Sequence, residues 1–120
     1  MQAKRIKDPT AIIVIILKEV LVARDIEMTV RESRPEASVF VARTLHEAVD
    51  ALPLGRIEVA FVQSDPRTIA TSPLGRRIAA EGGRVVVLSE DIRGALPVGW
   101  AALPFPFSSK AVAELLSAGP

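Results

Sequence analysis

The stretch Ala11–Leu17, with the sequence AIIVIIL, decides how this chain folds. Isoleucine and valine are stiff, β-branched residues, and an uninterrupted apolar run of them is typical of a strand buried on both faces. The run is far shorter than the roughly 20 apolar residues that cross a bilayer. Charged Lys18 and Glu19 follow it, where a signal peptide would carry small residues. The stretch therefore predicts a central parallel strand in a soluble protein, which we expect in the cytoplasm.

Helical and extended patterns alternate along the rest of the chain. Val22, Ile26 and Val30 recur at helical spacing, and Thr44 with Glu47 matches a capping box. Further strands are predicted at Ser38–Ala42, Glu58–Gln63, Arg84–Ser89 and Trp100–Leu103. Helices are predicted at Val20–Ser33, between Thr44 and Pro53, and at Pro73–Glu81, the last of which could begin one turn earlier. A final helix is predicted after a cap at Ser108 or Ser109. The residues Ser64-Asp65-Pro66 predict a turn.

This order predicts an α/β fold of the flavodoxin-like, doubly wound type, with a five-stranded parallel sheet in the order 2-1-3-4-5. Residues 11–118 are expected to form one domain, preceded by a flexible basic tail at residues 1–10. The segment Glu90–Gly99 contains two glycines and Pro97. The helix between the fourth and fifth strands is therefore expected to be short or absent.

Composition excludes several classes of function. Hydrophobic residues make up 49% and charged residues 24%, which is typical of a soluble globular domain. The formal net charge of +1 gives no reason to expect nucleic-acid binding. Cysteine is absent and His46 is the single histidine, so a disulfide scaffold, a thiolate metal site and a multi-histidine metal site are excluded. No glycine-rich phosphate-binding motif occurs, and we expect neither a cofactor nor enzymatic activity.

Acidic residues follow several of the predicted strands, at the edge where ligands of parallel sheets gather. Converging carboxylates there could hold a divalent cation. Acidic residues are also favoured in such turns because they cap the helices that follow. We therefore predict no metal site from these residues, which are Glu19, Asp65, Glu90 and Asp91.

The chain resembles the receiver domains of bacterial response regulators, the phosphate-accepting modules of two-component signalling. The similarity covers residues 11–118 and lies in element order and apolar pattern. It is clearest in the first helix and the segment that follows it, and continues through the later strands. The segments concerned are LVARDIEMTVRESRP (21–35), SVFVARTLHEAVDAL (38–52), EVAFVQ (58–63), VVVLS (85–89) and LPFPFSSKAVAELL (103–116).

The resemblance implies a phosphorylation site whose diagnostic residues are mostly replaced. Leu17 and Lys18 stand where the family has two magnesium-binding acidic residues. Gln63 stands where the family has the phosphate-accepting aspartate, and Phe105 where it has a lysine before proline. The hydroxyl residue that ends the fourth strand is retained as Ser89.

Phosphoryl transfer needs a nucleophilic carboxylate and a cation to neutralise the phosphoryl oxygens, and Gln63 and Lys18 supply neither. Lys18 is expected to pair instead with Asp65 or Glu90. The sequence thus predicts a pseudo-receiver: a non-enzymatic, phosphorylation-independent module that binds a signalling kinase or an output protein. Two alternatives stay open, namely phosphorylation on an unusual acid such as Asp65 and ligand binding by a Gln63, Ser64 and Ser89 cluster.

A protein-interaction surface is expected near the fifth strand, because a short preceding helix would leave apolar residues uncovered there. Its candidate residues are Trp100, Leu103, Phe105 and Phe107. Closed two-fold pairing is the commonest assembly of soluble proteins. We therefore predict a homodimer that forms through this surface and the last helix.

Overall fold

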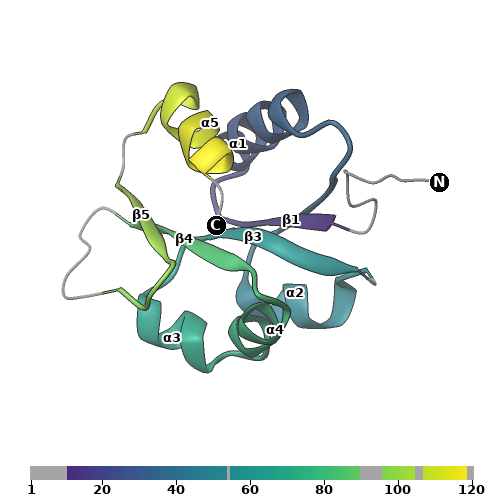
Figure 1. The fold of residues 1–120 in the computed structure, drawn as a ribbon, viewed down its shortest axis with the longest axis vertical. Coiled ribbons are helices and arrows are strands. Elements are labelled where there is room, and N and C mark those ends of the chain that lie inside the picture. Colours follow the sequence, from purple (N-terminus) through teal and green to yellow (C-terminus); the bar gives the residue numbers. More distant parts are fainter. Residues whose placement is uncertain (1–10, 54, 90–95, 105–106, 119–120) are drawn as a thin grey trace.

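The central feature of the structure is a five-stranded, fully parallel sheet in the order β2-β1-β3-β4-β5 (Figure 1). The structure is a computed structural model that describes residues 11–53, 55–89, 96–104 and 107–118. The strands are β1 (Ala11–Ile16), β2 (Ser38–Ala42), β3 (Arg56–Val62), β4 (Arg84–Ser89) and β5 (Ala101–Pro104). The predicted flavodoxin-like fold class and strand order are confirmed.

Helices cover both faces of this sheet. Figure 1 shows α1 (Val20–Ser33) and α5 (Ser109–Ala118) on one face. The other face carries α2 (Leu45–Ala51), α3 (Pro66–Thr71) and α4 (Pro73–Glu81). Three layers of this kind follow from parallel strands, because each crossover must pass over one face of the sheet.

Two apolar cores result, one on each side of the sheet. The odd-numbered residues Ile13, Ile15 and Leu17 pack toward α1 and α5, whereas Ile12, Val14 and Ile16 pack toward α2, α3 and α4. All of β1 is buried, which explains why its sequence lacks the polar–apolar alternation of a half-exposed strand.

One helix differs from the prediction. The predicted turn at Ser64-Asp65-Pro66 leads into a separate helix, α3, rather than an earlier start of the helix at Pro73. Asp65 caps α3, and Pro66 occupies its first position. Ser72 then ends α3 and caps α4, where it accepts a hydrogen bond from the Gly75 amide.

The two short helices pack closely at Gly75. A Cβ atom at this position would lie 2.0 Å from the carbonyl oxygen of Ile69 in α3. At the other end of α4, Gly82 takes up a left-handed conformation with φ of 74°, as expected for a glycine that ends a helix. The predicted start and end of α4 are confirmed.

The connection between β4 and β5 contains no helix over residues 96–100. The remainder of that connection, residues 90–95, lies outside the described residues, as does the predicted tail at residues 1–10. Within the described ranges, no helix is long and apolar enough to cross a bilayer.

Candidate functional site

The carboxyl ends of β1 and β3 meet at one edge of the sheet, at the positions where the receiver resemblance predicts a phosphorylation site. The amide of Gln63 donates a hydrogen bond to the carbonyl oxygen of Ile16 at 2.8 Å. The amide of Leu17 donates to Ala42 at the end of β2 at 3.1 Å. Gln63 therefore directly continues the strand that ends beside the β1–α1 connection, as the resemblance implied.

The side chain of Gln63 crosses to that connection and binds it at two points. Its Oε1 atom accepts a hydrogen bond from the amide of Lys18 at 3.1 Å. Its Nε2 group donates to Oε1 of Glu19 at 3.3 Å. We call this arrangement of Gln63, Lys18 and Glu19 the Gln63 clasp. It uses both ends of a carboxamide, which is a donor and an acceptor at once.

Glu19 occupies the N-cap position of α1 but makes no side-chain capping hydrogen bond. Its carboxylate faces Gln63 instead of the helix amides. The clasp thus connects the start of α1 to the end of β3 across 44 residues of sequence. The sequence did not predict this contact, because no local sequence pattern indicates a side-chain hydrogen bond between residues so far apart.

The predicted ion pair between Lys18 and Asp65 is not formed. Lys18 is exposed, and Asp65 serves as the cap of α3. The carboxylate accepts hydrogen bonds from the Thr68 hydroxyl at 2.6 Å and from the Thr68 amide at 2.9 Å. These bonds, the hydroxyl first, hold the pKa of Asp65 below its usual range. The other predicted partner of Lys18, Glu90, lies outside the described residues.

The remaining positions of the predicted phosphorylation site differ in their surroundings. Leu17 is fully buried in the core beneath α1 and α5. Ser89, at the end of β4 and opposite Pro104, is half-buried. Phe105 lies outside the described residues. The structure therefore brings Lys18, Glu19 and Gln63 into contact, whereas Leu17 belongs to the core.

The residues predicted to form an interaction surface near β5 do not lie together on one exposed face. Leu103 is only 5% exposed, because it packs with Val112 and Leu116 of α5 in the core. Trp100 packs against the core on the α2–α4 face, whereas Phe107 packs against the core on the α1–α5 face. These aromatic residues therefore lie on opposite sides of the sheet and do not form a common patch.

Charged residues gather at the opposite edge of the sheet, where they have structural partners. The Arg34 guanidinium binds the carboxylate of Glu58 through two nitrogens and also binds Glu36 at 2.6 Å. This hydrogen bond to Arg34 is the largest influence on Glu58 and lowers its pKa, against the opposing effect of burial. Arg84 donates to the carbonyl oxygen of Leu115 at 2.6 Å. These contacts fasten α1 and α5 to the sheet.

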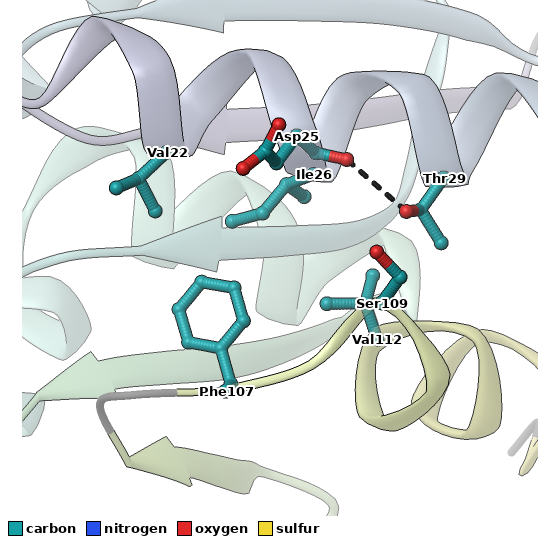
Figure 2. A pocket seen from close by; sticks show the side chains of 7 residues that line it. All are labelled: Val22, Asp25, Ile26, Thr29, Phe107, Ser109 and Val112. Atoms are coloured by element: carbon teal, nitrogen blue, oxygen red, sulfur yellow. Dashed lines mark hydrogen bonds between the residues drawn. The ribbon is translucent and has the colours of Figure 1, made fainter.

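A half-open pocket of about 160 Å³ lies between α1 and α5 (Figure 2). The sequence did not predict it, because it is formed by one face of α1 and the segment that enters α5. Its lining residues are Val22, Asp25, Ile26, Thr29, Phe107, Ser109 and Val112. It is separate from the Gln63 clasp, with which it shares no residue.

Acidic residues do not converge on a cation site in the described part of the chain. Within it, no three or more histidine, aspartate or glutamate side chains lie close enough together to hold a metal ion. Of the acids considered from the sequence, Glu19 belongs to the clasp and Asp65 to a helix cap. Glu90 and Asp91 lie outside the described residues.

Comparison with protein-family models, with curated proteins and with solved structures finds no match for this chain. The receiver resemblance therefore rests on the element order and on the segments quoted from the sequence.

Proposed function

We propose that this chain is a receiver-like interaction module that acts without being phosphorylated. In this proposal it is not an enzyme, and it binds a protein partner, a kinase or an output protein, in bacterial signal transduction in the cytoplasm. The observation that carries the proposal is the Gln63 clasp, because it occupies the place where a receiver would accept phosphate.

The chemistry of the clasp supports this proposal. A carboxamide is not a nucleophile toward a phosphoryl group, and both of its polar ends are already engaged by Lys18 and Glu19. A cation bound at this edge would have to compete with Gln63 for the carboxylate of Glu19. The exposed ammonium of Lys18 would also repel it.

The geometry speaks against the two alternatives. Both carboxylate oxygens of Asp65 accept hydrogen bonds from Thr68, so an attack on a phosphoryl donor would cost α3 its cap. Ligand binding by Gln63, Ser64 and Ser89 would likewise require Gln63 to release the β1–α1 connection.

The test is incubation of the wild-type protein with acetyl phosphate and Mg²⁺, followed by intact mass spectrometry. We expect no phosphoryl adduct. An adduct that is lost in Asp65→Asn would replace this proposal with an atypical receiver phosphorylated on Asp65. An adduct that survives Asp65→Asn would equally contradict it, since another side chain would then be the acceptor.

We further propose that the module is a two-fold homodimer, with the interface at residues 96–100, the described part of the connection that leads into β5. The support is Val98, whose side chain is fully exposed at 102%. Sedimentation equilibrium should show a dimer that is weakened in Val98→Asp. The control Leu21→Asp places the same charge on α1, at a site 76% exposed, and should leave dimerisation unchanged. A monomeric wild type, or a dimer sensitive only to Leu21→Asp, would refute this interface.

A further inference from the structure

We propose that the pocket between α1 and α5 binds a compact organic ammonium ion, that is, a small apolar body carrying one protonated amine. This proposal does not depend on the Gln63 clasp or on the absence of phosphorylation.

The walls of the pocket are suited to an apolar body. Ile26 and Val112 are each 1% exposed and form its floor, and Val22 and Phe107 are half-buried at its sides. Figure 2 shows the ring of Phe107 facing α1 across the pocket. The volume of about 160 Å³ is close to that of protein cavities of about 150 Å³ that admit benzene.

Three polar side chains among the described residues line the pocket, and two of them, Asp25 and Thr29, offer only acceptors, whereas the hydroxyl of Ser109 can also donate. Thr29 uses its hydroxyl hydrogen in a bond to the carbonyl oxygen of Asp25 at 3.1 Å, so its oxygen is left as an acceptor. The carboxylate of Asp25 has no hydrogen bond or ion pair within the described residues. In Figure 2 it lies over the α1 ribbon above Ile26, at the α1 border of the pocket.

These features select for positive charge. Asp25 is the one charged residue among the described residues that line the pocket, and it carries a negative charge. An ammonium group beside the Asp25 carboxylate would be attracted by its charge while the carbon body rests on Ile26 and Val112. An anionic ligand of the same size would be repelled by the Asp25 carboxylate, and the hydroxyl of Ser109 would be the one side-chain donor available to it among the described lining residues.

The test uses benzylammonium as the probe, with benzyl alcohol and benzoate as neutral and anionic ligands of matched shape. Amide chemical shifts of the ¹⁵N-labelled full chain report the site of binding. We expect saturable shifts at Thr29 and Val112 with a Kd of about 1 mM or tighter for benzylammonium. Benzyl alcohol should bind at least about threefold more weakly and benzoate should not bind.

Asp25→Asn is the decisive variant, because it removes the charge and keeps the shape of the exposed side chain. It should weaken benzylammonium about fivefold and leave benzyl alcohol within about twofold. Asp50→Asn, which removes an exposed acid from α2 on the other face, should change neither ligand. Three results would overturn the proposal: no saturation up to about 10 mM, equal binding of the three ligands, or equal effects of Asp25→Asn and Asp50→Asn.

Discussion

Replacement of Gln63 by aspartate introduces, at the position of the Gln63 amide, the nucleophile of the receiver family that this sequence resembles. Gln63→Asp removes one methylene and the donor group of the carboxamide, and it draws the acceptor oxygens back from the Lys18 amide. The shorter carboxylate cannot donate to Glu19, and it brings a second negative charge toward that residue. We expect the variant to be less stable than the wild type and still unable to accept phosphate, because Leu17 and Lys18 stand where the resemblance places the cation-binding acids and the Lys18 ammonium repels a cation there.

The expected loss of stability follows from the two hydrogen bonds of the Gln63 clasp. At 3.1 Å and 3.3 Å they are of ordinary to long length, and both are exposed to solvent, so each lies toward the lower end of what a hydrogen bond contributes. A net contribution of about 0.5–1 kcal/mol for each bond gives about 1–2 kcal/mol for the pair. For a domain of this size, that corresponds to a fall of about 4–8 °C in Tm.

The assay combines thermal unfolding with intact mass spectrometry after incubation with acetyl phosphate and Mg²⁺. Gln63→Met is the matched control, because it keeps the length of the side chain without its polar atoms. It should lose nearly as much stability as Gln63→Asp. If Gln63→Met is as stable as the wild type, the clasp contributes nothing and the reasoning fails. If Gln63→Asp alone gains one phosphoryl group as fast as Lys18→Asp/Gln63→Asp, the argument about the missing metal site is wrong.

Three further predictions concern stability. Leu17→Asp should lower the free energy of unfolding in urea by more than about 3 kcal/mol, because it buries an unpaired carboxylate. Lys18→Asp, at an exposed site, should change it by less than about 1 kcal/mol. Equal effects of the two substitutions would refute the burial argument. Gly75→Ala should lower the free energy of unfolding several times more than Gly82→Ala, which strains only a left-handed backbone and costs about 1 kcal/mol. Comparable Tm values for the two variants would contradict this. The paired carboxylate of Glu58 has a lowered pKa in the folded protein, so its stabilisation is complete above the unfolded-state value near 4.5 and is lost as the pH falls through the lower folded value. Glu58→Gln should therefore be less stable by about 1–2 kcal/mol at pH 7, and the difference should shrink toward pH 3; a constant difference would refute the assignment.

Much of the fold could be predicted from the sequence because local signals agreed with one another. The β-branched run at Ala11–Leu17 specified a buried strand, and Ser72, Pro73 and Gly82 specified both ends of a helix. The helix α3 was missed although Asp65 and Pro66 are a good start signal. It spans only Pro66–Thr71, which is too short for an apolar period to emerge.

The site was only partly predictable. The place of Gln63 beside the β1–α1 connection followed from strand order, since the carboxyl ends of β1 and β3 must be neighbours. Its hydrogen bonds did not, because they depend on side-chain rotamers and on residues far apart in sequence. The exposure expected of Leu103 was wrong for a related reason. Edge position suggested an open face, but the tertiary packing of α5 covers it.

The complete burial of β1 has a consequence for the unfolded chain. Because both of its faces are apolar, a shift by one residue exchanges isoleucines and valines for one another, and side-chain polarity cannot penalise the wrong register. Such a segment, without charge or proline, is also prone to stack with copies of itself into cross-β aggregates. Lys18 and Glu19 follow it immediately. Charges that flank an apolar strand oppose self-association, so we expect substitutions at both positions at once to make the unfolded chain more prone to aggregate.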